Sequence, residues 1–413
     1  MPSPISERSS RGDERSVLDA ARSPLHPAAR ATLLAALDAG WADPRRLHRE
    51  GRTARMLLDR ARESLAADLA VRPDELSVHP SGPDAVATGI AGLRHARRRV
   101  GHALVTSAAD TAAVLLAVGR ADPVLADPMP ADPVRADSVP ADPVPADPVP
   151  VDPLGRVDLD RFTAAVGVPG TALAVLHHGN GEVGTLQPVP AAAEACTRHA
   201  VPLLVDATAS LGRTDLPGGP WAALAGDAAS FAGPPLGLLA VRTGTRFALP
   251  GPRREPEHGR ARADPWVPLV LAAAEALRQV SAVRAAEEAS ARALVDRVRA
   301  AAGAVPDVEV VGDPQARLPH VVTFSALYAD GEALVGELDR RGVAVASGSA
   351  CTSSTLRPSH VLAAMGALTH GNVRVTLPLA AVAPSRDADV EHLLTELPGS
   401  VAAVRARLGA EGL

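Results

Sequence analysis

The sequence predicts an α/β protein in which a mostly parallel sheet, covered by helices, is joined to a second, smaller α/β domain. Apolar runs of strand length alternate with segments of helix length along most of the chain, which is typical of repeated βαβ units. The 413 residues are enough for two domains with separate cores. In sheets of this kind, ligands bind at the carboxyl ends of the strands.

We expect a disordered tail over 1–16, a large domain over 17–265 and a small C-terminal domain over 266–413. Ser81 precedes Gly82 and Pro83, which predicts a helix with serine as its cap and proline in its first turn. The other helices of the large domain are expected at Pro27–Leu37, Thr53–Leu69, Asp110–Val118 and Val189–His199. Its strands are expected at Ala103–Thr106, Thr171–His177, Pro202–Ala207, Ala228–Phe231 and Leu236–Arg242. The small domain is expected to hold a long helix at Pro268–Ala301, strands at Val308–Val311, Val321–Phe324, Val343–Ala346 and Asn372–Leu377, and helices at Asp330–Arg341 and Asp387–Leu408.

Residues 121–153 interrupt this alternation with a repeat of Ala-Asp-Pro-Val-Pro units that recur every five residues. Proline at this density prevents both helix and sheet and favours an extended, solvated polyproline II conformation. We expect an inserted surface loop, and a partner that reads proline-rich segments is the alternative.

Composition excludes several classes of function. Aromatic residues make up only 2% and the net charge is −5, so we expect no nucleic-acid partner. No run of about 18 apolar residues occurs, so we expect no membrane span. The two cysteines, Cys196 and Cys351, are too few for a disulfide scaffold. Because the N-terminus also lacks an apolar signal-peptide core, we expect a cytoplasmic protein, and we identify no metal site.

Cys351 lies in a segment of small residues, Ser347-Gly348-Ser349-Ala350-Cys351-Thr352-Ser353, which follows an apolar strand run. Ser359 then caps a short apolar helix. With no bulky neighbour the thiol is expected to be reachable, and nearby hydroxyl and N–H donors favour its reactive thiolate form. The alternative is a free cysteine buried as a small hydrophobic residue, against which the flanking serines and threonines argue.

This segment, with Pro358-Ser359-His360-Val361-Leu362 after it, resembles the catalytic loop of the cysteine desulfurases, pyridoxal-phosphate enzymes of the class V aminotransferase group. The resemblance runs from about Leu18 to the C-terminus and implies the fold type I architecture of pyridoxal-phosphate enzymes and a homodimer. In that family the loop cysteine takes sulfur from free cysteine as a persulfide. The resemblance therefore makes Cys351 the candidate catalytic residue.

Three further motif positions resemble the family. Asn180 matches the asparagine that reaches the cofactor's phenolic oxygen and the substrate, and Asp206 matches the aspartate that pairs with the pyridinium nitrogen. Arg374 matches the arginine that clamps the substrate carboxylate with a bidentate fork. Taken singly, the three residues could instead be a loop amide, a strand-end turn residue and an exposed strand residue.

Other positions depart from the family. All 42 basic residues are arginine, so the chain has no lysine to form a Schiff base. The lysine-bearing segment is absent between Asp227 and Gly237. Asp84 places a carboxylate where the cofactor phosphate is expected, and Thr111 replaces the histidine that stacks on the ring. The threonine that the partner subunit would contribute is also lost, at Asp264. Asp206 and Asn180 are thus expected to be remnants of a cofactor site.

Three hypotheses follow. The chain is a sulfur carrier that acts through Cys351 without its own cofactor and exchanges persulfide with a donor or acceptor protein. It is otherwise a non-catalytic binding or regulatory subunit, in a homodimer or in a heterodimer with an active paralogue. The third hypothesis is an ordinary cysteine desulfurase that converts L-cysteine to alanine and an enzyme persulfide.

Overall fold

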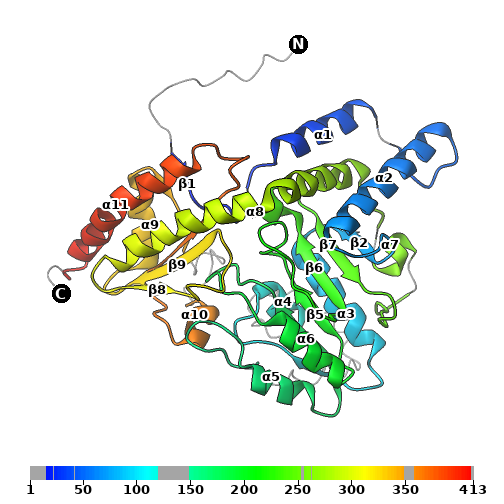
Figure 1. The fold of residues 1–413 in the computed structure, drawn as a ribbon, viewed down its shortest axis with the longest axis horizontal. Coiled ribbons are helices and arrows are strands. Elements are labelled where there is room, and N and C mark those ends of the chain that lie inside the picture. The colour runs from blue at the N-terminus through cyan, green and yellow to red at the C-terminus, as the bar shows by residue number, and fades with distance from the viewer. Residues whose placement is uncertain are drawn as a thin grey trace, which may run out of the picture.

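The computed structural model describes residues 15–21, 23–40, 42–119, 148–252, 255–261, 263–347 and 358–410, and the statements below concern these residues. Six strands form the main sheet, in the order β2-β7-β6-β5-β4-β3 (Figure 1). They are β2 (Leu76–His79), β3 (Ala103–Val105), β4 (Thr171–His177), β5 (Leu203–Asp206), β6 (Ala223–Asp227) and β7 (Gly237–Val241). The pairs from β3 to β6 are parallel, whereas β7 is antiparallel to both of its neighbours. The expected, mostly parallel sheet is confirmed, with an antiparallel edge.

Helices cover both faces of this sheet because the buried strands are apolar on both sides. On one face, α3 (Gly82–Ala96) and α4 (Ala112–Ala117) pack against Leu104, Leu173 and Leu239. The opposite face is covered by α1 (Pro27–Asp38), α2 (Arg49–Asp68), α5 (Leu159–Val166), α6 (Val189–Arg198) and the first half of α8 (Val267–Gly303). A short helix, α7 (Pro256–Gly259), lies next to β2.

The small domain is built on a three-stranded antiparallel sheet in the order β11-β9-β8. Its elements are β8 (Val308–Val311), β9 (Val321–Ala326), β10 (Val343–Ala344), β11 (Asn372–Thr376), α9 (Gly331–Arg340), α10 (His360–Met365) and α11 (Arg386–Arg407). The second half of α8 belongs to the core of this domain, whereas its first half packs in the core of the large one. One helix therefore runs through both domains (Figure 1).

The chain's N-terminal segment also belongs to the small domain. Strand β1 (Ser16–Val17) pairs in parallel with β10, and Asp19 forms a bridge to Thr376. Leu18 is fully buried in the small-domain core. Ser16, the last residue of the expected tail, is thus part of a strand, and the large domain does not begin at residue 17.

Two local expectations differ from the structure. The expected strand Ala228–Phe231 is wrong, because these residues form a 3-10 helix and the strand is β6, just before it. The β6 sequence Ala-Leu-Ala-Gly-Asp has low intrinsic strand propensity, but it is held between β5 and β7 in the buried sheet. The antiparallel strand β2 was not expected.

The last residues of the expected proline-rich insert are part of the folded body. Val149 is buried, and its main chain bonds with Thr106 and Ala108 beside the end of β3. Val151 forms a bridge with Val157. The repeat over 120–147 lies outside the described residues. Within the described part, no helix combines the length and apolarity needed to cross a bilayer.

Candidate functional site at the strand ends

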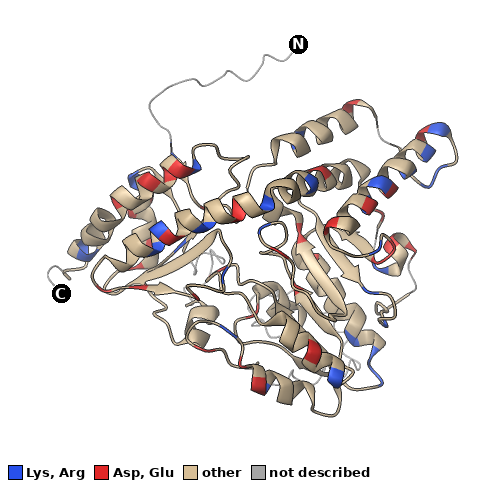
Figure 2. Cartoon of the chain, in the orientation of Figure 1, with Lys and Arg blue, Asp and Glu red and all other residues tan. Residues whose placement is uncertain are grey.

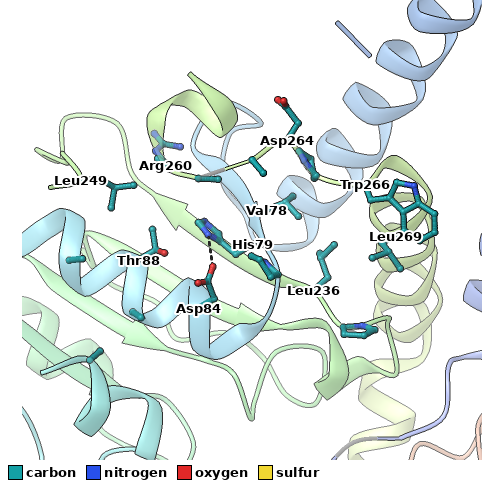
Figure 3. Close-up of a pocket in the computed structure, with 18 of the residues that line it drawn as sticks. Val78, His79, Asp84, Thr88, Leu236, Leu249, Arg260, Asp264, Trp266 and Leu269 are labelled. Carbon is teal, nitrogen blue, oxygen red and sulfur yellow. Dashed lines mark ion pairs between the residues drawn. The ribbon is translucent and has the colours of Figure 1, made fainter. Parts of the chain in front are cut away.

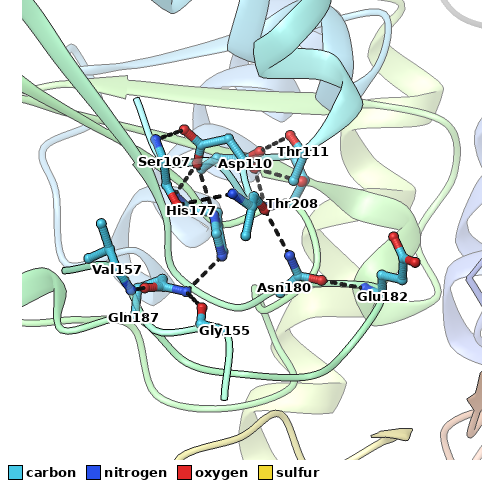
Figure 4. A network of polar contacts seen from close by, with 12 residues as sticks. Ser107, Asp110, Thr111, Gly155, Val157, His177, Asn180, Glu182, Gln187 and Thr208 are labelled. Carbon is cyan, nitrogen blue, oxygen red and sulfur yellow. Dashed lines mark hydrogen bonds and ion pairs between the residues drawn. The ribbon is translucent and has the colours of Figure 1, made fainter. Parts of the chain in front are cut away.

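A buried polar network lies at the carboxyl ends of β3 and β4 (Figure 4). His177 Nδ1 lies 2.9 Å from Asp110 Oδ1, and Gln187 Nε2 lies 3.0 Å from His177 Nε2. The main chain fixes the Gln187 amide, because its Oε1 accepts from Val157 N and its Nε2 donates to Gly155 O. An amide nitrogen can only donate, so His177 accepts at Nε2 and donates from Nδ1 to Asp110. The network holds the loop after β3 against the end of β4.

The same loop supplies a hydroxyl to Asp206, the last residue of β5. Thr111 Oγ1 donates to Asp206 Oδ2 at 2.7 Å. Thr208 donates to Oδ1 from its main-chain N at 2.9 Å and from its Oγ1 at 2.6 Å. Asp206 is only 1% exposed and lies beside His177 in the sheet register. Both carboxylate oxygens therefore have donors from this chain, and the cofactor role of Asp206 stays a prediction.

Asn180 is hydrogen-bonded to its own surroundings. Its Nδ2 donates to Ala109 O at 2.9 Å, and its Oδ1 accepts from Glu182 N at 2.8 Å and from Val183 N at 3.0 Å. These bonds close the turn after β4 and tie it to the loop after β3 (Figure 4). The expected contact of Asn180 with cofactor and substrate stays a prediction.

Arg374 lies on β11, where its main chain exchanges two hydrogen bonds with Ala346, at 2.7 and 3.1 Å. Its Nε is buried and has no hydrogen-bond partner within the described residues, and neither does Glu182 Oε1. Burial raises the pKa of Glu182, while a hydrogen bond from Ser359 and the charges of Arg374 and His360 oppose that rise. The motif after β4 also contacts the small-domain sheet directly, because Thr323 Oγ1 of β9 donates to Glu182 O.

Cys351 itself lies outside the described residues, but both flanks of its loop are placed. Ala346 pairs with Arg374 before the loop, and Ser359 caps α10 after it. His360 Nε2 donates to the main-chain oxygen of Asp110 at 2.9 Å. Because Asp110 belongs to the network of His177, the small domain contacts the large one next to the polar site.

The turn that joins β6 to β7 is short and closed. Ala228 N donates to Leu236 O, and Gly233 N donates to Ala228 O, each at 2.8 Å. Ala232 takes the left-handed conformation at φ 56°, and its oxygen accepts from His26 N. This is the position where the family resemblance places the lysine-bearing segment, and here the turn is closed by main-chain hydrogen bonds.

Two carboxylates lie at the first turn of α3, where a cofactor phosphate was expected. Asp84 N donates to the capping Ser81 Oγ, and Asp84 Oδ2 lies 3.4 Å from His79 Nδ1. The Asp227 side chain packs so closely on Gly82 that a Cβ added there would be 2.6 Å from its Oδ2. Like charges about 4 Å apart repel by on the order of 4 kcal/mol at an effective dielectric of about 20. The turn is therefore unfavourable for a phosphate dianion.

A cleft of about 580 Å³ opens beside this turn (Figure 3). Its walls are mostly apolar, and its polar and aromatic lining residues are His79, Asp84, Thr88, Arg260, Asp264 and Trp266. Burial lowers the pKa of His79 and outweighs the opposing charge of Asp84. The cleft also receives Leu236, so it lies directly against the closed β6–β7 turn.

The sequence reasoning missed Asp110, His177, Gln187 and Glu182 as site residues. A signal was present for two of them, because Asp110 follows one buried strand and His177 ends the next. Polar residues at adjacent parallel strand ends converge on one edge. Within the described part of the chain, no group of three or more His, Cys, Asp or Glu side chains could hold a metal ion.

Comparison with known proteins gives the family. The model of the class-V aminotransferases matches residues 143–217 and 255–389. An IscS-like cysteine desulfurase of Mycobacterium tuberculosis is 30% identical over 413 residues, which cover 95% of this chain and 98% of that relative. The chain belongs to the cysteine desulfurase family of class-V aminotransferases.

Other family members match over a shorter region. The cysteine desulfurase IscS of Methylococcus capsulatus is 33% identical over 259 residues, covering 61% of this chain and 62% of that relative. Among solved structures, a NifS-like protein superposes with a TM-score of 0.76 at 20% identity, covering 93% of this chain and 99% of that one. An apo cysteine desulfurase of Thermococcus onnurineus gives 0.72 at 18% identity, covering 98% and 100%. These likenesses establish the fold type I architecture.

The cysteine desulfurase family implies pyridoxal phosphate, but the residues present do not fit that group. No lysine exists in the chain to form a Schiff base. Both oxygens of Asp206 already accept hydrogen bonds from this chain, from Thr111 and Thr208. The expected phosphate position is flanked by Asp84 and Asp227. The mismatch is therefore spread over three separate parts of the site.

Proposed function

We propose that this cysteine desulfurase-like protein carries sulfur as a persulfide on Cys351 and performs no pyridoxal-phosphate chemistry of its own. The observation that carries the proposal is the closed turn after β6, where Ala228 N bonds to Leu236 O. It closes a gap in a chain that has no lysine, while the cysteine motif around Cys351 is kept. Such a protein lacks the group that extracts sulfur from free cysteine and keeps the group that receives it.

The transfer needs no cofactor and no added oxidant. The Cys351 thiolate attacks the outer sulfur of a persulfide on a donor protein. The donor's sulfur–sulfur bond breaks, its inner sulfur leaves as a thiolate, and a new sulfur–sulfur bond forms on Cys351. The total number of electrons and of sulfur–sulfur bonds is unchanged. The acceptor cysteine must therefore be a reachable thiolate, and nothing more is required of it.

The described flanks of the loop support this role. Arg374 brings a cation to the strand that pairs with Ala346 at the start of the loop, and its Nε has no hydrogen-bond partner among the described residues. A nearby positive charge favours a thiolate over a thiol. Arg374 in this proposal assists the anionic sulfur, and its role toward a substrate carboxylate remains the alternative.

The chain provides its own control for a transfer experiment. Cys196 is buried on α6, and burial raises the pKa of its thiol to about 12. When the protein is incubated with an active cysteine desulfurase and L-cysteine, we expect one added sulfur, on Cys351. Mass spectrometry after thiol labelling should find it in the wild type and in Cys196→Ala, and not in Cys351→Ser. Transfer that survives Cys351→Ser contradicts the proposal.

A second candidate function is a non-catalytic binding subunit. The cleft beside α3 favours it, because an apolar surface with the exposed Trp266 is typical of a contact with another chain. The partner would be a second copy of this chain or an active paralogue. Light scattering and co-purification of Trp266→Ala with an active desulfurase test this candidate. The binding-subunit function is favoured if Trp266→Ala no longer associates with its partner chain while Cys351→Ser still does.

A further inference from the structure

Two side chains lie close together in the cleft beside α3 without an ordinary hydrogen bond between them. His79 Nδ1 and Asp84 Oδ2 are 3.4 Å apart, whereas an N–H···O hydrogen bond is usually about 2.7–3.2 Å long (Figure 3). The His79 side chain is 1% exposed, and the Asp84 side chain is 49% exposed. Both residues line the cleft. A deeply buried imidazole therefore meets a carboxylate that a ligand can reach.

The proton of His79 is placed by the residue on its other side. Ser77 Oγ lies 3.1 Å from His79 Nε2 and donates to Leu239 O, also at 3.1 Å. A main-chain oxygen can only accept, so Ser77 uses its one proton there and accepts from His79 Nε2. Burial lowers the pKa of His79 and outweighs the charge of Asp84, which keeps the ring neutral at pH 7. A neutral imidazole carries one proton, so Nδ1 presents a lone pair toward Asp84.

His79 Nδ1 and Asp84 Oδ2 are therefore both acceptors, and we call them the acceptor pair. Within the described ranges, His79 is the one basic side chain at ion-pair distance from Asp84. The start of α3 carries only about half a positive charge, less than the charge of Asp84 alone. The Asp227 carboxylate, packed on Gly82, adds a second negative charge there. A cation that donates N–H bonds would satisfy both atoms of the pair.

The walls of the cleft indicate what such a cation carries. Leu236, Leu249 and Leu269 line it, and the side of Trp266 adds an aromatic ring that is 38% exposed. Its volume of about 580 Å³ lies within the range of roughly 300–1,000 Å³ that is usual for sites of small organic molecules. The cleft is therefore suited to a small ligand with an apolar body and a charged end.

The other charges in the cleft leave Asp84 as the group that sets its sign. Arg260 donates from one nitrogen to the main-chain oxygens of residues 74 and 75, at 2.9 and 2.8 Å. Asp264 pairs with Arg45 at 3.1 Å. Elsewhere, basic and acidic positions are interspersed along α2, α8 and α11 (Figure 2). No broad surface field therefore favours one sign of ligand, and the preference arises within the cleft.

We propose that the cleft beside α3 binds a small primary amine, whose ammonium group donates to His79 Nδ1 and Asp84 Oδ2 while its apolar body lies against the leucine-lined wall. A primary ammonium has three N–H donors, so it can serve two acceptors 3.4 Å apart. A carboxylate on the ligand would be repelled by Asp84, so a simple amine binds more tightly than an amino acid. The site uses no sulfur and no cysteine, and it lies beyond the proposed function.

Calorimetric titration of the full-length protein with 2-phenylethylamine tests the site. We expect binding to the wild type and about 10- to 100-fold weaker binding to Asp84→Asn, because a hydrogen bond to a charged group is lost. Asp160→Asn is the matched control, since Asp160 is an exposed acid in the first turn of α5, as Asp84 is in that of α3. It should bind the amine as the wild type does. Thermal unfolding checks that each variant is folded.

Three related probes test the same site without changing the protein. The alcohol 2-phenylethanol lacks the charge, N,N-dimethyl-2-phenylethylamine has a single N–H, and L-phenylalanine adds a carboxylate. We expect each to bind the wild type at least about tenfold more weakly than 2-phenylethylamine. Equal affinity of the amine for the wild type and Asp84→Asn would overturn the proposal. So would equal affinity of the wild type for the amine and the alcohol, or a wild type that does not bind the amine.

Discussion

The two halves of the polar site differ in how their buried groups are satisfied. At the strand ends of the large domain, Asp110, His177, Asn180 and Asp206 all have hydrogen-bond partners from the chain itself. Near the site, the buried polar atoms without a partner among the described residues are Thr106 Oγ1 and Glu182 Oε1 in the large domain, and His320 Nδ1, Arg374 Nε and Thr376 Oγ1 around β9 and β11. A buried polar group without a partner costs about 1–3 kcal/mol.

Unpartnered atoms are more numerous on the β9 and β11 side, beside the flanks of the Cys351 loop. In the large domain, Asp206 already accepts hydrogen bonds from Thr111 and Thr208. A fold tolerates unpartnered atoms where a ligand, water or another part of the chain supplies the missing bonds. We therefore expect a ligand on the β11 side of the site.

The largest expected effect concerns pyridoxal-phosphate catalysis at the strand ends of the large domain. With L-cysteine, pyridoxal phosphate and a reductant, we expect sulfide release at the no-enzyme rate, roughly 10³-fold or more below an active desulfurase, because no lysine can act as base. The protein should purify colourless. Absorbance after dialysis and a sulfide assay check both points. Pyridoxal phosphate retained at one molecule per chain would contradict the expectation that this site does not hold the cofactor.

Inserting a lysine-bearing segment tests whether the missing lysine alone explains the expected loss of cofactor binding. Adding a family-like Ser-Gly-His-Lys segment after Ala229 should not restore cofactor binding by itself, because Asp84 and Thr111 remain. Combining it with Asp84→Thr and Thr111→His should raise cofactor retention above that of the insertion alone. If the insertion alone suffices, the losses at Asp84 and Thr111 do not matter.

The next effect compares the same substitution in the two halves. Thr111→Val removes the donor to Asp206 Oδ2 and should cost about 1.5–3 kcal/mol, as for a bond to a charged group. Thr376→Val removes a hydroxyl that has no partner among the described residues, so its effect should stay within about 0.5 kcal/mol or be stabilising. Urea unfolding measures both. Equal losses would mean that the two halves are satisfied alike.

The pH dependence of stability should have opposite signs at two carboxyl groups. Burial raises the pKa of Glu182, so as pH rises above the ordinary value of 4.5 the folded state loses stability relative to the unfolded state. Hydrogen bonds from Arg340, Arg341 and Arg407 lower the pKa of Glu337 to about 2. Its contribution is present above pH 4.5 and is lost as pH falls toward 2.

Unfolding titrations between pH 3 and pH 7 distinguish the two groups. Glu182→Gln should gain stability relative to the wild type as pH increases, and Glu337→Gln should lose it. Curves that stay parallel to the wild type would contradict the assigned environments.

The smallest effect belongs to the repeat. Deleting 121–147 should change the melting temperature little, because a doubling of loop length costs only about 0.6 kcal/mol and exposed ion pairs contribute about 0–1 kcal/mol. Deleting 121–149 should cost more, because Val149 is buried and its main chain bonds to Thr106 and Ala108. Similar melting temperatures for the two deletions would mean that Val149 contributes nothing.

The alternation of strands and helices was enough to predict the mostly parallel main sheet and a second, smaller α/β domain. It failed at Ala228–Phe231, where the apolar residues belong to a 3-10 turn, and it missed β2, whose four residues carry two polar side chains. The motif residues Asp206 and Asn180 were located correctly at strand ends. Their hydrogen-bond partners could not be foreseen, because the bond from Thr111 to Asp206 joins residues far apart in sequence. The expected role of Cys351 rests on its motif alone.

The strand pairing at the N-terminus has a consequence for dissecting the molecule. A fragment that starts at Val267 would contain all three strands of the β11-β9-β8 sheet but would lack Ser16, Val17 and Leu18. It would leave β10 with an open edge and a hole in its core where Leu18 belongs. The N-terminal segment and helix α11 therefore share one hydrophobic core. A peptide carrying residues 15–20, supplied separately, is the natural complement for any truncated version.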